Sequence, residues 1–297
     1  MSERDGHLDQ LFQILVGYAD RAIEEFDERC RSWPLDPNQN EVHEVVGGLL
    51  SRQTTLAVEI AHGPPMWTPH IAPLLLRPMV DLRITFAWIL QEPVTRSRQF
   101  VRYGLGQVKL SMEHLKAKLA ATGGDPESNA QVKMLQQWID GQRFHFLTEV
   151  NVGNWAEKDL RTMATDCGCE TLYREDFQNW SSATHSMWHH IQPFSLEPCR
   201  NPLHRGGHRV PRASLPFPPD LDYPRAAAHY LDDTFEVFDT FRGEKPNCAS
   251  ALEWFESELA KLGDRIKVRP TTPEDPPMVS NKSPSIVDSV RNSNQES

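Results

Sequence analysis

Apolar residues recur every three or four positions along most of this 297-residue chain, and this period restricts the fold more than any other feature. The spacing places apolar side chains on one face of an α-helix, whereas no alternating β-strand pattern extends beyond a few residues. The segment from His7 to Cys30 shows the period most clearly. Its apolar positions are Leu8, Leu11, Phe12, Leu15, Ala19, Ala22, Ile23 and Phe26. The period therefore predicts an all-α fold.

Proline, glycine and asparagine residues divide the periodic sequence into separate helices, because they interrupt helical hydrogen bonding or favour helix ends. The breaks predict a single bundle of about seven or eight helices, with a short helix at residues 157–165. The longer helices are expected at residues 7–30, 41–62, 69–91, 94–121, 125–150, 172–191, 223–241 and 250–262.

Two segments depart from the helical pattern. Residues 193–219 contain seven prolines, a density that no helix tolerates, so we expect a long ordered loop or a lid. Residues 264–297 contain five prolines, six serines and no aromatic residue, which is the composition of a disordered tail. The predicted organisation is one all-helical domain at residues 1–263 and a disordered C-terminal tail at residues 264–297.

The charge balance limits the partners of this protein. Asp and Glu total 41 against 31 Lys and Arg, and the net charge of −10 argues against a broad nucleic-acid-binding surface. The five cysteines suggest no disulfide framework and fit reduced thiols in the cytoplasm. The most apolar stretch, residues 71–90, contains Arg77, Asp81 and Arg83, which a membrane span tolerates poorly. We therefore expect a cytoplasmic protein with no membrane partner.

The predicted helix at residues 69–91 carries a carboxylate where its apolar face should be. Asp81 shares that face with Leu74 and Trp88, and Arg77 lies at its edge. A buried carboxylate is costly unless it is paired, and Arg77 lies one helical turn from Asp81. Two interpretations follow, namely a local structural ion pair and a preorganised polar site inside the bundle.

The predicted helix at residues 172–191 carries polar groups among aromatic ones. Ser181 and His185 are four positions apart, so the hydroxyl and the imidazole can meet. The face predicts either a pocket with aromatic walls or an aromatic core seam that contains a satisfied histidine. No oxyanion-hole motif accompanies the pair, which argues against serine hydrolysis. The whole face consists of Tyr173, Phe177, Trp180, Ser181, Thr184, His185, Trp188 and Ile191.

No residue pattern predicts a specific metal site or a cofactor. His185 and His189 have helical ligand spacing but lack the glutamate of the His-Glu-x-x-His motif. Cys167 and Cys169 are separated by one residue, which is tighter than usual zinc-ligand spacing, and no second cysteine pair matches them. Further candidate ligands lie in the proline-rich segment at Cys199, His204 and His208.

The segment from Arg200 to Arg209 is basic within an acidic protein. Arg200, Arg205 and Arg209 are candidates for binding an anion, either a phosphate or a nucleic-acid backbone. A solvated loop with local counter-charges explains the same residues, so nucleic-acid binding is the less favoured interpretation.

Taken together, these residues resemble a known family. The string Leu75-Leu76-Arg77-Pro78-Met79-Val80-Asp81 is similar to the Arg-x-x-x-Glu element of the mainly bacterial, all-helical domain of unknown function family 5677. That family continues with a tryptophan-led helix and a Tyr-x3-Tyr-x3-Ser-x3-His helix. The matching positions are Trp155, Tyr173, Phe177, Ser181 and His185.

The resemblance spans about residues 40–240 and implies a fold and a polar cluster, not an established reaction. Asp81 replaces the longer glutamate of the family motif, which shortens the reach of the carboxylate. Phe177 replaces a tyrosine, so no role of that hydroxyl carries over.

Two functions follow from these observations. The first is a module in which Arg77, Asp81, Tyr173, Ser181 and His185 form a polar cluster that grips a small polar ligand or a protein partner, or fixes helix register. The alternative is a HEPN-like RNA-cleaving toxin or antiphage effector, with His185 as acid–base group and the basic segment holding phosphate. The HEPN signature of Arg, four to six residues and His is absent, so this function requires a degenerate motif. The sequence does not decide whether the protein is an enzyme.

Overall fold

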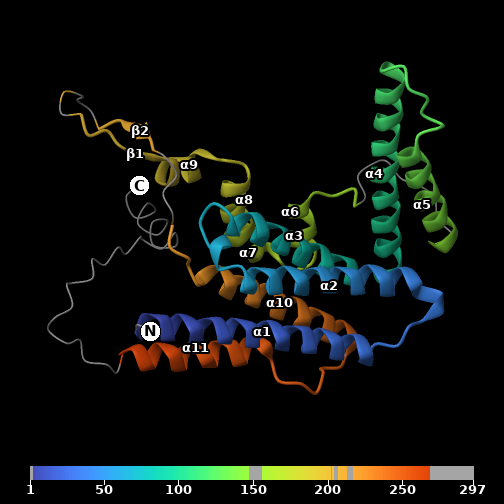
Figure 1. The fold of residues 1–297 in the computed structure, drawn as a ribbon. Helices are drawn as coiled ribbons and strands as arrows, with labels where there is room; N and C mark the ends of the chain where they lie inside the picture. Colours follow the sequence, from blue (N-terminus) through green and yellow to red (C-terminus); the bar gives the residue numbers. More distant parts are fainter. Residues whose placement is uncertain (1–2, 147–155, 202, 204–206, 213–216, 268–297) are drawn as a thin grey trace.

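The computed structural model describes residues 3–146, 156–201, 203, 207–212 and 217–267. These residues form the all-α bundle that the periodicity predicts (Figure 1). Helix α1 packs against α2 and α11, while α10 packs against α2 and α3. The bounds are α1 Glu3–Ser32, α2 Asn40–His62, α3 Ala72–Gln91, α10 Asp222–Arg242 and α11 Ala251–Lys267, with short 3-10 helices at Pro37–Gln39 and Pro64–Met66.

One apolar core joins these five helices. Burying a large apolar side chain contributes about 1.5–3 kcal/mol, so the core outweighs any local preference of a single turn. It holds α3 along most of its length, because every turn of that helix contributes a buried residue. The buried side chains include Leu15, Tyr18, Leu50, Leu76, Ile84, Phe86, Phe235 and Phe255.

The predicted helices between residues 7 and 121 lie where the sequence placed them, with ends that differ by a few residues. The helix expected from residue 125 begins later, at Ala130. The Asn129 side chain explains the shift, because its Oδ1 accepts hydrogen bonds from the amides of Gln131 and Val132 at 3.0 and 3.2 Å. Such a side-chain acceptor satisfies amides that a helix start leaves unpaired.

Helices α4 (Pro93–Ala121) and α5 (Ala130–Phe146) form an arm that projects from the bundle (Figure 1). The arm has a small apolar cluster of its own, centred on Met112, Val132 and Ile139. Helix α4 also packs against α2, so the arm is anchored at its base. The expected C-terminal end of the second arm helix, at residues 147–150, lies outside the described residues.

The expectation of a single helix at residues 172–191 is wrong, because the chain turns after Thr184. The turn includes Ser186 at a positive φ of 50°, a conformation that a continuing helix excludes. The elements of this region are α6 (Leu160–Asp166), α7 (Glu170–Leu172), the π-helix η3 (Tyr173–Phe177), α8 (Gln178–Thr184) and α9 (Trp188–Ser195).

The proline-rich segment is more regular than expected. Helix α9 includes Pro193, and a short antiparallel hairpin follows, formed by β1 (Leu196–Pro198) and β2 (Arg209–Pro211). Helix α11 continues to Lys267, past the predicted domain end at residue 263, and residues 268–297 of the predicted disordered tail lie outside the described residues. Among the described helices, none combines the length and apolar character needed to cross a membrane.

Candidate functional site

The two segments that carry the anomalous polar groups, α3 and residues 166–181, lie side by side and run in opposite directions. Arg77 near the start of α3 contacts Ser181, whereas Trp88 near its end contacts Asp166. Arg83, between them, contacts Cys169. Residues later in α3 contact residues earlier in the 166–181 segment. The two segments therefore run antiparallel and meet along one seam. The packing of α3 in the apolar core and the helical turns of residues 166–181 place these polar groups opposite one another.

Arg77 is the centre of the polar cluster. Its Nε donates a hydrogen bond to Ser181 Oγ at 2.7 Å, and its Nη1 donates to the Asp81 carboxylate. Its guanidinium carbon lies 3.3 Å from the centroid of the Phe177 ring, a cation–π arrangement. The Arg77 side chain is only 15% exposed, so the guanidinium is held among these three partners.

Asp81 is less enclosed than its partner, with 41% of its side chain exposed. Burial raises the pKa of its carboxyl, and the hydrogen bond and charge of Arg77 oppose that rise. Its second oxygen, Oδ1, is enclosed and accepts no hydrogen bond within the described part of the chain. The pair therefore differs from a closed structural ion pair, because one carboxylate oxygen retains the capacity to accept a donor.

Ser181 and His185 do not form the expected pair. Ser181 Oγ donates to the carbonyl oxygen of Phe177 at 2.6 Å while it accepts from Arg77, so its single proton is already used. His185 follows the last residue of α8 and its side chain is exposed. The helical spacing itself holds, because the His185 amide donates to the Ser181 carbonyl at 2.9 Å, but the Ser181 hydroxyl is bound to Arg77 and Phe177 and the imidazole is exposed to solvent.

Tyr173 extends the cluster to a surface cavity. Its ring stacks on that of Phe177, with centroids 4.6 Å apart and planes at 22°. Tyr173 also lines a cavity of about 380 Å³ between α6 and the start of the 170–184 helical segment. The cavity is lined by Arg161, Thr165, Glu170, Tyr173, Arg174 and Gln178.

The sequence analysis missed the π-helix that carries Tyr173 and Phe177. A π-helical turn is rare and often occurs at functional sites. Asp176 in this turn has a raised carboxyl pKa, because it is buried, while a hydrogen bond from Tyr230 acts in the opposite direction. Trp180 Nε1 donates to the same Tyr230 hydroxyl at 2.8 Å. Tyr230 lies on α10, so no local sequence signal could reveal these contacts.

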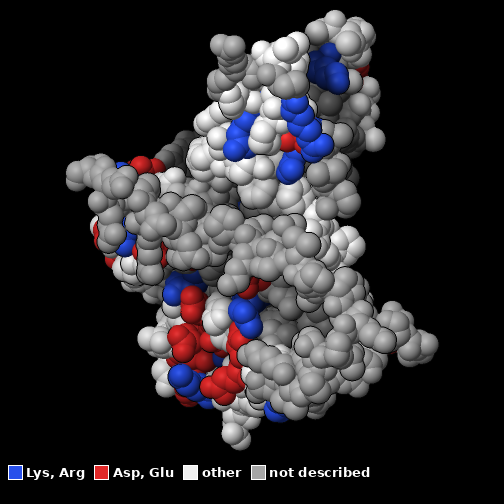
Figure 2. Space-filling model, turned by 90° about the vertical axis from the view of Figure 1, so that its left-hand side faces the viewer, with Lys and Arg blue, Asp and Glu red and all other residues white. Residues whose placement is uncertain are grey.

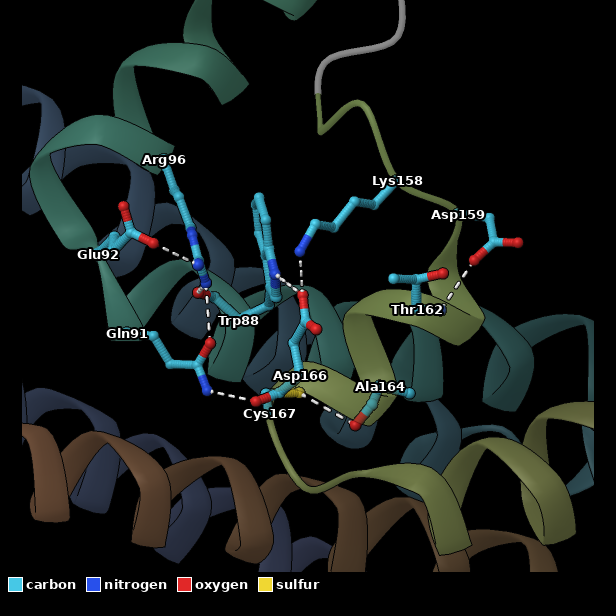
Figure 3. A network of polar contacts seen from close by, with 10 residues as sticks. All are labelled: Trp88, Gln91, Glu92, Arg96, Lys158, Asp159, Thr162, Ala164, Asp166 and Cys167. Carbon is cyan, nitrogen blue, oxygen red and sulfur yellow. Dashed lines mark hydrogen bonds and ion pairs between the residues drawn. The ribbon is translucent and has the colours of Figure 1, made fainter.

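A second polar network closes the far end of the seam (Figure 3). The Asp166 carboxylate accepts hydrogen bonds from Lys158 Nζ at 2.5 Å and from Trp88 Nε1 at 3.3 Å. The hydrogen bond from Lys158 is the main reason that the pKa of Asp166 is lowered. Arg96 lies 3.8 Å from the centroid of the Trp88 ring and donates to Gln91. This network fixes α6 against the end of α3.

Two of the three predicted anion-binding arginines, Arg200 and Arg209, lie at the β1–β2 hairpin. Arg200 is exposed and 3.9 Å from Glu197, and Arg209 donates to the carbonyl of Gln192 at 3.3 Å, whereas Arg205 lies outside the described residues. In Figure 2, Lys and Arg side chains gather in the upper part of the face and acidic side chains in the lower part. Within the described part of the chain, neither Arg200 nor Arg209 forms a hydrogen bond or ion pair with His185, and RNA cleavage stays a prediction.

The described part of the chain contains no group of three or more His, Cys, Asp or Glu side chains arranged to hold a metal ion. His204, one of the candidate ligands, lies outside the described residues.

Residues 43–199 match a family described as a family of unknown function, DUF5677. The match covers more than half of the chain and includes both sides of the seam. This chain belongs to the DUF5677 family. No curated protein and no solved structure matches it. Helices α1 and α10, which pack against the DUF5677 region, and α11, which packs against α1 and α10, lie outside the match.

The structure shows how the two departures from the DUF5677 motif are accommodated. Asp81 still reaches Arg77 despite its shorter side chain, and Phe177 presents its ring to the same guanidinium without needing a hydroxyl. Of the other motif positions, Tyr173 and Ser181 contact Phe177, and Trp155 lies outside the described residues.

Proposed function

We propose that this DUF5677 protein binds a small polar ligand with an anionic group in the cavity beside Tyr173. The position of Tyr173 carries the proposal, because its ring lines the cavity while it stacks on Phe177, which in turn lies against Arg77. The polar cluster predicted from the sequence is thereby connected to a space that a ligand can enter.

The cavity has the chemistry of an anion site with an aromatic wall. Two arginines, Arg161 and Arg174, line a volume of about 380 Å³ together with Glu170, and this volume is within the range of small-molecule pockets. Guanidinium groups bind carboxylates and phosphates through paired hydrogen bonds. Arg174 is also 3.4 Å from Glu175, but both side chains are exposed, and an exposed pair of this kind restrains the arginine little.

The Arg77 cluster acts as a positioning group in this proposal. It holds Phe177 through its guanidinium and Ser181 through a hydrogen bond, so the ring that supports Tyr173 has a fixed place. A preorganised wall reduces the entropy that is lost when a ligand binds.

Calorimetric titration with phenyl phosphate, benzoate, inorganic phosphate and sulfate tests the proposal. We expect phenyl phosphate to bind with a dissociation constant of about 1 mM or lower. Arg161→Gln and Arg174→Gln should each weaken binding about tenfold, because each removes charge-assisted hydrogen bonds.

Two further variants make the result specific. Tyr173→Ala should remove the preference for phenyl phosphate over inorganic phosphate, because the stacking surface is lost. Arg31→Gln is the matched control, since Arg31 is 69% exposed on α1 and away from the cavity lining. Absence of binding by all four probes, or equal binding by the Arg161→Gln and Arg31→Gln proteins, would contradict the proposal.

A further inference from the structure

The turn between α6 and α7 carries two cysteines that the ligand proposal does not use. Helix α6 ends in a Schellman motif, in which the Cys169 amide donates to the Ala164 carbonyl at 2.7 Å and the Gly168 amide donates to the Thr165 carbonyl at 3.4 Å. Gly168 has a φ of 72°, which only glycine adopts without steric cost. The motif explains the glycine of the Cys-Gly-Cys sequence but requires neither cysteine.

The two thiols have different environments. Arg83 Nη1 donates to Cys169 Sγ at 3.6 Å, and a guanidinium can only donate, so the contact favours the thiolate of Cys169. The Cys167 Sγ lies 3.8 Å from the carbonyl oxygens of Ile84 and Ala164, which are acceptors and favour the protonated thiol.

The pKa shifts of the pair agree with this assignment. A hydrogen bond from Cys167 is the main cause that lowers the pKa of Cys169, and the charge of Arg83 adds to it. Burial and the charge of Asp233 oppose the shift. The pKa of Cys167 is raised, mainly because its proton is held by Cys169. Cys169 Sγ also lies 3.7 Å from the carbonyl oxygen of Cys167, so the guanidinium of Arg83 is the contact that selects Cys169 as the nucleophile of the pair.

We propose that Cys167 and Cys169 form a dithiol that a hydroperoxide oxidises to an intramolecular disulfide, with Cys169 as the nucleophile and Cys167 as the resolving thiol. A thiolate beside a second cysteine is the arrangement of peroxide-sensitive sites. Cys167 is partly exposed, whereas Cys169 is buried beside it with 8% of the residue exposed, so the oxidant must be small. This inference does not depend on the ligand proposal.

The chemistry balances with hydrogen peroxide as oxidant. The Cys169 thiolate attacks one peroxide oxygen, the O–O bond breaks, and a sulfenic acid forms as hydroxide leaves. The hydroxide takes the proton of Cys167 and becomes water. The Cys167 thiolate then attacks the Cys169 sulfur, the S–S bond forms, and the S–O bond breaks with loss of hydroxide. A thiol reductant reverses the reaction by exchange.

Peptide mass spectrometry tests the proposal on the whole protein. Tryptic cleavage after Arg161 and Arg174 leaves both cysteines in one peptide. After mild peroxide treatment and alkylation, we expect that peptide to be lighter by two hydrogens and free of alkyl groups. Cys248 is the internal control, because burial raises its thiol pKa, and it should stay fully alkylatable. Full alkylation of Cys167 and Cys169 after peroxide, or equal oxidation of Cys248, would overturn the proposal.

Variants assign the two roles. Cys167→Ser should leave a sulfenic acid on Cys169 that dimedone labels, whereas Cys169→Ser should abolish the reaction with peroxide. Arg83→Gln should slow alkylation of Cys169 at pH 5 about tenfold, because one pKa unit changes the thiolate fraction tenfold well below the pKa of about 6, and Arg83→Lys should restore much of the rate. Dimedone labelling of Cys167 in the Cys169→Ser protein would reverse the assignment and overturn the proposal.

Discussion

Two arginine–carboxylate pairs in this protein share the same components but are built differently. Arg29 on α1 binds Asp239 on α10 through two hydrogen bonds of 2.9 and 2.8 Å, and both side chains are no more than 7% exposed. Arg77 binds Asp81 within one helix, and Asp81 is 41% exposed with one oxygen left unpaired among the described residues. Each arginine also lies over a phenylalanine ring, that of Phe235 or Phe177.

The difference teaches what each pair does. The Arg29–Asp239 pair joins two helices that are 210 residues apart and satisfies both carboxylate oxygens, so it fixes the packing of α1 on α10. The Arg77–Asp81 pair joins residues that one helix already holds together, so it adds little to the fold. Its enclosed but unpaired carboxylate oxygen, among the described residues, and the contacts of Arg77 to Ser181 and Phe177 suit a positioning group.

The largest expected effect on stability comes from breaking the Arg29–Asp239 pair. Arg29→Met should lower the free energy of unfolding by about 3–5 kcal/mol, because it leaves the Asp239 carboxylate buried without its partner. Urea unfolding measures the loss. The double variant Arg29→Met/Asp239→Leu should recover a large part of it, since the Asp239 charge is removed together with its partner. A loss below about 1 kcal/mol in the single variant would show that the two pairs are equivalent.

An intermediate effect on stability is expected from the titration of Glu25, which lies 3.9 Å from Arg29. Burial raises the pKa of Glu25 to about 7 from an ordinary 4.5, although Arg29 opposes the rise. The folded protein therefore binds more protons than the unfolded chain between these values, and the contribution of Glu25 to stability falls as pH rises from about 4.5 to 7.

Glu25→Gln isolates this effect. We expect the variant to be more stable than the natural protein above pH 7 by roughly 3 kcal/mol, the equivalent of this pKa shift, and nearly equal in stability near pH 4, where the side chain is mostly neutral in both states. Urea unfolding across this pH range measures the difference. A stability gain that is independent of pH would contradict the assigned titration.

The smallest effect is expected from the Arg77–Asp81 pair itself. A double-mutant cycle with Arg77→Ala and Asp81→Ala should give a coupling free energy below about 1 kcal/mol, the range of partly exposed pairs within a helix. Thermal or urea unfolding of the four proteins provides the cycle. A coupling as large as that of Arg29 with Asp239 would mean that the Arg77 cluster mainly stabilises the fold. The contrast between the two pairs would then be wrong.

The cluster at Arg77 was accessible to sequence reasoning because its components follow helix geometry. Arg77 and Asp81 are one turn apart, and an ionic pair on an apolar face stands out from its neighbours. The Arg29–Asp239 pair was not accessible, because 210 residues separate its members and each occupies an ordinary position in its own helix. The partnership of Tyr230 with Trp180 was hidden for the same reason.

The expectation of one continuous helix at residues 172–191 was wrong because of a break that the sequence does not signal. The residues up to Ile191 keep a helical period, yet the chain turns at His185 and Ser186 and starts α9 at Trp188. Proline and glycine, the usual signals of a helix end, are absent from this turn.

The sequence by itself determined the helices, the polar residues on their apolar faces and the resemblance to DUF5677, because helical period and short motifs are local properties of the chain. Only the tertiary structure decided that α3 runs against residues 166–181, that Arg77 meets Ser181, and that Arg83 meets Cys169. These contacts join residues 86 and 104 positions apart, and their geometry depends on how the core packs the helices rather than on any one segment.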